Sequence, residues 1–465
     1  MPAPVSEALD VLIDAGHEAV LVGGCVRDLV RGERPGDWDV ATAADPERTL
    51  ELFAGSSLEN RFGTVTVRRN GVVLQVTPFR SEGTYADHRR PDVVRFGAGL
   101  LQDLQRRDFT INAMAWSPTG RGDATDGGVA RDGELIDSHG GRDDLRAGIL
   151  RAVGDPDRRL SEDALRLLRA VRFAFRLGLR LESATREAIA RRAADARLLS
   201  GERVRDELGR ILGSREPPPS VAFALMEELR LLGELLPEVA ALRGVLQAKA
   251  LPGDALDHSL RTMDALPADD PVLRLAGLLH DLGKPQTLVE DRFVGHEVVG
   301  ADLARGILER FRYSRAEIER VTHLVRHHMF AYAPDWTDAA VRRFVRRVGS
   351  DQLADLFALR RADNAASGVA EPPRGGLSEL ERRIDVAMRD AAVETRQLAI
   401  DGKVLMDELG LEAGPRIGRL LHRLLDVVME DPTRNRRDEL LAIAREDLSA
   451  SGRLAPSTEA GEPTK

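Results

Sequence analysis

The sequence predicts an α+β protein in which a mixed α/β head is followed by an all-helical body. Over residues 1–138, short apolar runs rich in β-branched residues alternate with turn residues, as strands do in a small mixed domain. From about residue 142 the apolar positions recur with the period of a helix, as in 162–177, 183–194 and 220–232. At 465 residues the chain is long enough for roughly two to four domains.

Strands are expected in the head wherever an apolar run is bounded by turn residues. The Asn70-Gly71 pair between two of these runs is a strong signal for a two-residue hairpin turn. The expected strands are 18–24, 38–43, 64–69, 72–80, 92–96 and 111–117.

The pattern divides the chain into five segments. The head covers 1–140, and a helical neck covers 141–250, in which Pro217-Pro218-Pro219 separates two helical stretches. A second helical domain covers 251–370, and a C-terminal helical segment follows at 371–447. The small, polar residues of 448–465 predict a disordered tail.

Composition excludes several classes of protein. The single cysteine, Cys25, excludes a disulfide framework and a cysteine-based zinc site. No apolar run approaches the roughly 20 residues that span a bilayer, and residues 1–14 lack the pattern of a signal peptide. We therefore expect a cytoplasmic protein with no membrane partner. The sequence gives no expectation of the oligomeric state.

The charge of the chain is unevenly distributed. The net charge is −9, yet residues 141–216 carry 18 arginines against 13 acidic residues. This local excess makes the neck the expected docking surface for a polyanion. Of the 67 basic residues, 63 are arginine and only four are lysine, at positions 249, 284, 403 and 465.

A glycine pair after the first expected strand is a candidate phosphate-binding loop. Gly23 and Gly24 precede a predicted helix, where free backbone N–H groups attract phosphate, and Arg27 adds a positive charge on the same turn. A glycine pair by itself is more often a tight turn than a binding site.

Two carboxylates close to this loop strengthen the interpretation. Asp37 and Asp39 alternate at the start of the second expected strand, so their side chains face the same side of the sheet. Two neighbouring like charges favour neutralisation by a hard divalent cation, which prefers carboxylate oxygen. Together, the loop and the acid pair predict nucleotidyl transfer with Mg²⁺ bound at Asp37 and Asp39.

The order of these motifs resembles a known family. Gly23 to Asp28, followed by Asp37 to Thr42, resembles the head of class II CCA-adding tRNA nucleotidyltransferases and bacterial poly(A) polymerases, which have a polymerase-β-like nucleotidyltransferase head. The resemblance implies that residues 80–91 form a flexible loop of the head. It also implies a ribose-contacting motif at Arg106, Arg107, Asp108 and Asn112, a base-selecting helix at 162–173, and a bracing element at Glu202-Arg203.

The base-selecting segment also has a physical interpretation. Asp163, Arg166, Arg169 and Arg172 are three apart and are expected to form a drifting row on one helix face. Cytosine and adenine both present an amine donor beside a ring-nitrogen acceptor, which suits one carboxylate and one arginine. The resemblance assigns this pairing to Asp163 and Arg166, and directs Arg169 and Arg172 toward phosphate or the supporting network.

Histidines and acidic residues gather in the second helical domain. Histidine with carboxylate is a ligand set typical of transition metals. The series resembles the HD superfamily of metal-dependent phosphohydrolases, with His280-Asp281 as its central signature. The expected ligands of a divalent transition metal are His258, His280, Asp281, His296, Asp363 and one of His327 and His328, of which we favour His327.

The function implied by the resemblance is template-independent addition of C, C and A to the 3′ end of tRNA from CTP and ATP, with release of pyrophosphate. A second, phosphohydrolase activity in the HD domain is part of the expectation. Two alternatives stay open: a poly(A) polymerase of the same family, and an HD phosphohydrolase with a non-catalytic head. The sequence leaves open whether one enzyme adds all three nucleotides.

Overall fold

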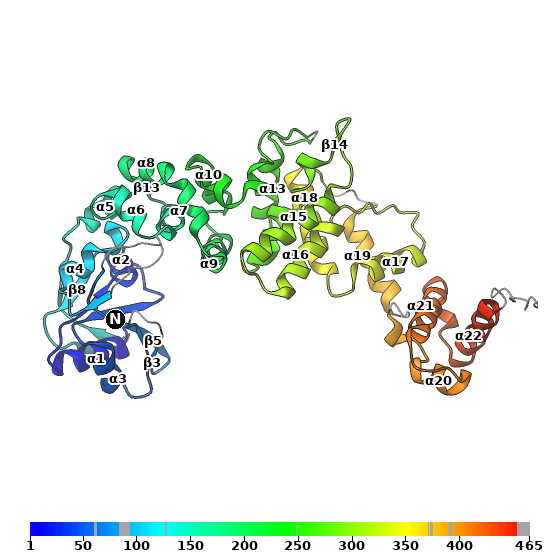
Figure 1. Cartoon of the computed structure of the whole chain (residues 1–465), viewed down its shortest axis with the longest axis horizontal. Helices are drawn as coiled ribbons and strands as arrows, with labels where there is room; N and C mark the ends of the chain where they lie inside the picture. Colours follow the sequence, from blue (N-terminus) through cyan, green and yellow to red (C-terminus); the bar gives the residue numbers. More distant parts are fainter. Residues whose placement is uncertain are drawn as a thin grey trace, which may run out of the picture.

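The computed structural model describes residues 1–59, 63–82, 94–125, 128–247, 249–370, 372, 375–389 and 394–452. Figure 1 shows an elongated, curved molecule with the head at one end and the last three helices at the other. The expected α+β architecture is confirmed, with a mixed sheet in the head and helices after it. The proposed flexible loop at 80–91 lies outside the described residues from 83 onward, as does the tail from 453.

The head is built around one seven-stranded sheet of order β11-β8-β1-β2-β5-β4-β3. All neighbouring strands are antiparallel except β2 and β5, which are parallel. Helices α1 (Ala3–Asp14) and α3 (Pro46–Leu52) pack on one face. The strands are β1 (Ala19–Val22), β2 (Trp38–Thr42), β3 (Ser57–Leu58), β4 (Val65–Arg69), β5 (Val72–Pro78), β8 (Ala115–Pro118) and β11 (Gly133–Ile136).

The hairpin prediction is confirmed, whereas one strand prediction needs correction. Asn70 and Gly71 have positive φ angles of 47° and 77° and join β4 to β5. The strand expected over 111–117 is wrong at its start, because η1 (Thr110–Asn112) is a 3-10 helix and the strand begins at Ala115. β7 (Val94–Phe96) pairs only with β6 (Arg80–Glu82), outside the main sheet.

The neck differs from the expectation where the base-selecting helix was predicted. α6 (Pro156–Glu162) ends before α7 (Leu165–Leu177) begins, so the helix expected over 162–173 is interrupted. Asp163 has extended backbone angles and lies outside both helices. The other neck helices are α5 (Gly141–Ala147), α8 (Ser183–Arg191), α9 (Gly201–Leu212), α10 (Ser220–Glu228), α11 (Leu231–Leu235) and α12 (Pro237–Ala240).

One apolar core extends from the neck into the second helical domain. It runs from Phe109 to Ile384, and buried Arg274 donates hydrogen bonds to the carbonyls of Leu212 and Ser214 at the end of α9. The division at residue 250 stays a prediction, and packing across it is continuous. The helices that follow are α13 (Ala255–Asp264), α14 (Pro271–Leu279), α15 (His296–Arg310), α16 (Arg315–His327), α17 (Asp338–Val348), α18 (Leu353–Ala366) and α19 (Leu377–Arg389).

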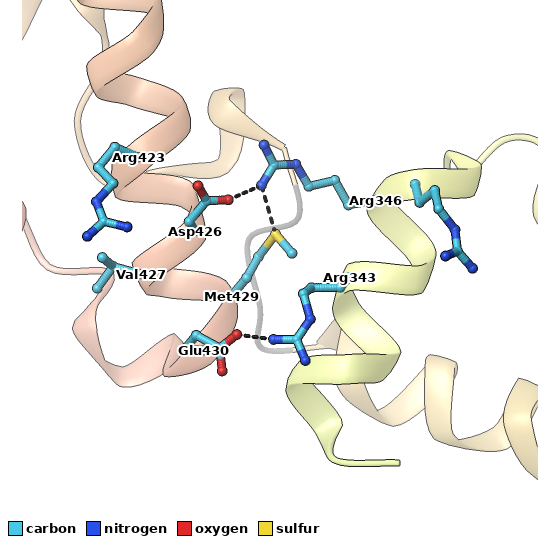
Figure 2. A pocket seen from close by; sticks show the side chains of 8 residues that line it. Arg343, Arg346, Arg423, Asp426, Val427, Met429 and Glu430 are labelled. Carbon is cyan, nitrogen blue, oxygen red and sulfur yellow. Dashed lines mark hydrogen bonds and ion pairs between the residues drawn. The ribbon is translucent and has the colours of Figure 1, made fainter. Parts of the chain in front are cut away.

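The last three helices, α20 (Gly402–Leu409), α21 (Pro415–Glu430) and α22 (Arg437–Gly452), enclose a core of their own. Arginines of α17 join them to the rest of the molecule. Arg342 is buried and donates to the carbonyl of Met429, while Arg343 and Arg346 pair with Glu430 and Asp426 across a groove of about 560 Å³ (Figure 2). None of the helices in the described part of the chain is long and apolar enough to cross a membrane.

Candidate functional sites in the head and the HD domain

The glycine loop lies where the sequence predicts it, between β1 and α2 (Gly24–Val30). Gly23 has φ 73° and ψ −130°, a conformation that L side chains rarely adopt. A Cβ at Gly23 would lie 2.8 Å from Nη1 of Arg107 and 3.7 Å from Oδ2 of Asp39. Glycine is therefore favoured by the backbone conformation, and it also leaves room for the guanidinium of Arg107.

The two aspartates lie beside this loop. Asp37 is exposed just before β2, and Asp39 is partly exposed within it. Burial raises the pKa of Asp39 and the negative charges of Asp37 and Glu59 raise it further, while Arg107 acts in the opposite direction. Neighbouring carboxylates offer only oxygen ligands, which fit a divalent cation such as Mg²⁺.

Glu59 is a third acid that the sequence alone did not place. Asp39, Gln75 and Thr66 lie opposite one another across β2, β5 and β4, and the hydroxyl of Thr66 donates to Glu59 Oε2 at 3.1 Å. Only this strand register brings Glu59 toward Asp39. No local pattern around residue 59 marks it as a site residue.

A buried acid orients the two arginines of the ribose motif. Asp103, in α4 (Leu100–Gln105), is 1% exposed and accepts hydrogen bonds from Arg106 at 2.5 and 2.9 Å and from Arg107 at 3.1 and 3.4 Å. Arg107 also donates to the carbonyl of Asn112. Sequence reasoning missed Asp103, although its spacing of three and four residues from the arginines is the spacing of ion pairs on a helix.

Asp108 ties the ribose motif to the neck. It accepts from the amide of Asn112 at 3.2 Å and from Nε of Arg169 at 2.7 Å. Burial alone would raise the pKa of Asp108, but the charges of Arg169 and Arg166 outweigh it and lower the pKa to about 2. Arg27 of the glycine loop donates to Asn112 Oδ1 at 3.0 Å, which joins all three motifs in one network.

Reading of the base by Asp163 and Arg166 stays a prediction, and in the structure the two side chains contact different protein partners. Asp163 Oδ2 accepts from Arg203 at 2.7 Å, which connects it to the predicted bracing element on α9. Arg166 is buried and donates to Glu162 at 2.6 Å and to the carbonyls of Arg159 and Arg106. The row on one helix face is wrong at its first member, because Asp163 precedes the helix.

Phe173 is a further residue whose role sequence reasoning missed. The guanidinium groups of Arg172, Arg169 and Arg27 lie 4.3, 5.1 and 5.6 Å from the centre of its ring. Arg172 also pairs with the buried carboxylate of Glu207 on α9. Stacking on one aromatic ring therefore holds arginines from the head and the neck side by side.

The HD domain brings a second set of predicted residues together at the ends of five helices. His258 Nε2 lies 3.2 Å from His280 Nε2 and 3.1 Å from Asp363 Oδ1. His296 Nε2 lies 3.4 Å from His328 Nε2. All five of these side chains, and that of Asp281, are buried.

Asp281 lies between these two groups. Its Oδ2 is 3.2 Å from His280 Nε2 and 3.5 Å from His258 Nε2. Its Oδ1 is 3.4 Å from His296 Nε2 and 3.9 Å from His328 Nε2. Among the described residues, the spacing allows a single ion to be held by His258, His280 and Asp363 or by His280, Asp281 and His328. We call His258, His280 and Asp363 the first ligand set, and we call His296 and His328, which both face Oδ1 of Asp281, the second ligand set.

Backbone hydrogen bonds orient three of the four rings. Nδ1 of His280, His296 and His328 bonds the carbonyl three residues earlier in each case, at 2.7, 3.0 and 2.7 Å. The ring N–H is thereby used at Nδ1, and the lone pair of Nε2 points into the cluster. This is the arrangement of metal-binding histidines, so the residues present fit one or two divalent transition metals.

The structure corrects the choice between His327 and His328. His328 is fully enclosed, and burial lowers its pKa to about 3. His327 instead stacks on His323, with ring centres 4.4 Å apart, away from the ligand sets. A helix turns by about 100° per residue, so adjacent histidines cannot both face the cluster.

Two lysines border the cluster. Lys249 Nζ lies 2.7 Å from His258 Nε2, and Lys284 Nζ donates to Asp281 Oδ2 at 2.6 Å. Burial lowers the pKa of Lys249 to about 8. A pocket of about 550 Å³ opens from the cluster to solvent, and its lining includes both lysines, Arg292 and Arg360. An open pocket with cationic walls above a metal-ligand cluster suits a phosphate ester.

Comparison with protein families matches three segments of the chain. Residues 19–151 match the poly A polymerase head domain, and residues 178–242 match a probable RNA- and SrmB-binding site of polymerase A. Residues 254–367 match the HD domain.

Several characterised relatives are similar over nearly the whole chain. An A-adding tRNA nucleotidyltransferase of Deinococcus radiodurans is 34% identical over 88% of this chain and 91% of its own. A CC-adding tRNA nucleotidyltransferase of Thermus thermophilus is 35% identical over 89% and 90%. A CCA-adding enzyme of Lactiplantibacillus plantarum is 30% identical over 95% of both chains.

A solved structure agrees with these relatives. The CCA-adding enzyme of Bacillus stearothermophilus in complex with CTP superposes with a TM-score of 0.67 and 27% identity, covering 97% of this chain and 98% of its own. The chain belongs to the family of CCA-adding tRNA nucleotidyltransferases and poly(A) polymerases, in its form that carries an HD domain after the neck.

Proposed function

We propose that this enzyme adds C, C and A to the 3′ end of tRNA from CTP and ATP and releases pyrophosphate. The observation that carries the proposal is the acid pair Asp37 and Asp39 beside the Gly23 turn and Arg107. Three relatives named for CC, A or CCA addition, each similar over most of its length, support tRNA as the substrate.

The reaction assigns a task to each part of the head. Mg²⁺ held by Asp37 and Asp39 would neutralise the charge that develops on the transferred phosphate. The backbone N–H groups after Gly23 and the guanidinium of Arg27 bind the triphosphate. Asp103 holds Arg106 and Arg107 in place, so that their orientation is set before the nucleotide arrives.

Choice of the base falls to Asp163 and Arg166. The carboxylate accepts from the exocyclic amine, and the arginine donates to the ring nitrogen that cytosine and adenine share in this position. Arg203 orients Asp163 through its 2.7 Å contact. Uracil and guanine carry a carbonyl in place of the amine, and such a buried mismatch costs about 1–3 kcal/mol.

A poly(A) polymerase is the rival within the family, and product analysis separates the two. Transcripts of tRNA that end before CCA, after the first C and after CC would each be incubated with CTP, ATP or both. We expect C, C and A to be added in that order and extension to stop there. A long A tail on any RNA 3′ end would contradict the proposal. Extension by CC alone, or by A alone, would restrict the chain to one half of the reaction.

We also propose that the HD domain hydrolyses phosphate esters such as terminal phosphates or 2′,3′-cyclic phosphates on RNA ends. The support is the buried ligand cluster at the base of a pocket lined by Lys249, Lys284, Arg292 and Arg360. The test is hydrolysis of 2′,3′-cyclic nucleotides with Mn²⁺, Ni²⁺ or Co²⁺. The absence of both bound metal and turnover with all three ions would contradict it.

The remaining alternative, an HD phosphohydrolase with a non-catalytic head, is disfavoured because Asp37, Asp39, Asp163 and Arg166 are all retained. A cytoplasmic location stays a prediction, supported by the tRNA-directed names of the relatives. The proposed tRNA-docking surface remains the arginine-rich neck, in which Arg142, Arg158 and Arg210 are exposed.

A further inference from the structure

Lysine is rare in this chain, and its placement is not random. Of four lysines among 67 basic residues, two border the HD cluster. Arginine supplies a broad planar fork, whereas lysine supplies a compact point charge on a flexible stem. Lysine is therefore the cation that fits between closely spaced ligand atoms and can also withdraw from them.

Lys249 contacts the atoms that a metal would use. Its ammonium lies 2.7 Å from His258 Nε2 and 3.5 Å from Asp363 Oδ1. These two atoms and His280 Nε2 form one of the groups whose spacing allows them to hold a single ion. In its charged form Lys249 has only donors, so in this contact His258 Nε2 accepts with its one lone pair in the tautomer that carries its proton at Nδ1. A metal bound to His258 at about 2.0–2.2 Å would need the same lone pair.

The second ligand set is differently placed. His296 Nε2 and His328 Nε2 face each other and Oδ1 of Asp281. Lys284 donates to the opposite oxygen, Asp281 Oδ2, and to the side chain of Gln247. Contact between a lysine ammonium and a ligand nitrogen is therefore seen in the first ligand set and not in the second.

Lys249 also has space in which to withdraw. It lies in the segment between α12 and α13, is one-fifth exposed, and lines the pocket of about 550 Å³ that opens from the cluster. The ammonium can thus leave His258 for the pocket wall without any rearrangement of the helices that carry the ligands.

From these contacts we propose that Lys249 is an internal cation that competes with divalent metal for the first ligand set. The cluster then loads in two unequal steps, first at His296, His328 and Asp281, and afterwards at His258, His280 and Asp363 with displacement of Lys249. The inference rests on the proposal that the HD cluster binds divalent metal. It adds that the metal affinity of the second step is set by Lys249, a side chain that is not itself a ligand.

The test is a Co²⁺ titration of the metal-free, full-length protein, followed by visible absorption and calorimetry. The titration is made in a protein that also carries Asp37→Asn and Asp39→Asn, so that these two carboxylates of the head cannot bind cobalt. We expect two steps, and Lys249→Met should tighten the weaker step by about tenfold or more while leaving the stronger step unchanged. Lys249→Gln, which is neutral but polar, should give the same result.

Controls isolate the lysine contact from general charge effects. Lys403→Met removes an exposed lysine far along the chain and should change neither step. In a His258→Ala background, Lys249→Met should no longer alter cobalt affinity, because the contested nitrogen is gone. In the metal-free state, Lys249→Met should lower the melting temperature, since Asp363 loses a counter-ion.

The possible outcomes separate the two proposals. Equal cobalt affinities for the parent protein and both Lys249 variants would overturn the competition while leaving the metal site intact. Tightening that persists in the His258→Ala background would also overturn it. Failure of the parent protein to bind Co²⁺ would overturn the metal-site proposal and this inference with it.

Discussion

The two candidate sites of this molecule hold their charged groups in place in different ways. In the head and neck, arginines reach acids on other elements, as in Arg169 with Asp108, Arg203 with Asp163 and Arg172 with Glu207. In the HD domain, histidine rings are fixed by backbone carbonyls three residues earlier, and the cations that contact the cluster include two lysines beside Arg360. The site of the head and neck is held together by contacts between different elements, whereas the ligand residues of the HD domain lie at helix ends, where the nearby backbone orients them.

This difference indicates what each site can do. A network of arginine forks stays positive and fixes orientation, which suits a site that receives a triphosphate and selects a base. A cluster of imidazoles and carboxylates beside a removable ammonium suits a site that takes up metal. Each prediction below tests one side of this contrast.

The largest effect is expected from Asp39→Asn. Loss of a carboxylate that would hold Mg²⁺ should lower the rate of CTP incorporation into tRNA by at least about a thousandfold. Binding of Co²⁺ to the HD cluster should be unchanged. Asp132→Asn, an exposed acid of the same domain, is the matched control. Near-normal incorporation of CTP by Asp39→Asn would contradict the assignment of catalysis to the head.

The next largest effect is a difference in Co²⁺ binding between variants of two adjacent histidines. His328→Ala should weaken Co²⁺ binding by about a hundredfold, whereas His327→Ala should leave it unchanged, because only His328 faces Asp281. Cobalt titration of the two variants side by side measures this directly. The reverse order of effects would show that the cluster is assembled differently from the geometry described above.

A third effect is expected in the pH dependence of stability. The pKa of Asp108 is lowered to about 2, so its stabilising contribution is complete above its ordinary pKa near 4 and is lost as the pH falls toward 2. The shift corresponds to about 2 kcal/mol in the free energy of unfolding. Urea unfolding of the parent protein and of Asp108→Asn should therefore give curves that converge between pH 4 and pH 2. A constant difference over that interval would contradict the assignment.

The smallest effect concerns the choice of base. Asp163→Ala should raise incorporation of UTP and GTP relative to CTP and ATP by about tenfold, because the discriminating acceptor is removed. Arg203→Ala should cause a weaker change in the same direction. Asp157→Ala, which removes an acid of α6 that pairs with Arg191, should leave the ratio unchanged. A uniform loss for all four nucleotides would give Asp163 a supporting role only.

The site residues that could be predicted are those whose chemical role follows from the residues next to them in the sequence. Gly23, the Asp37 and Asp39 pair, and His280-Asp281 carry their signal within a few residues, and a strand or helix end fixes their direction. Asp103 carried only the weak signal of ion-pair spacing on a helix, and Glu207 carried none, since its partner Arg172 lies on another helix.

Other features depended on geometry that no residue pattern encodes. The break between α6 and α7 places Asp163 outside the helix that carries Arg166, without any change in the motif. The choice of His328 over His327 depended on where α16 ends. Lys249 approaches His258 only because the segment before α13 folds back over the cluster.

The most direct test of the account compares nucleotide addition with and without the HD cluster. His280→Ala with Asp281→Ala should abolish Co²⁺ binding by that cluster. The initial rate of CCA addition to tRNA should stay within about twofold of the parent protein, because the double variant leaves the head network untouched. A fall in addition that parallels the loss of metal, in a protein that still unfolds cooperatively, would contradict the claim that the two sites act separately.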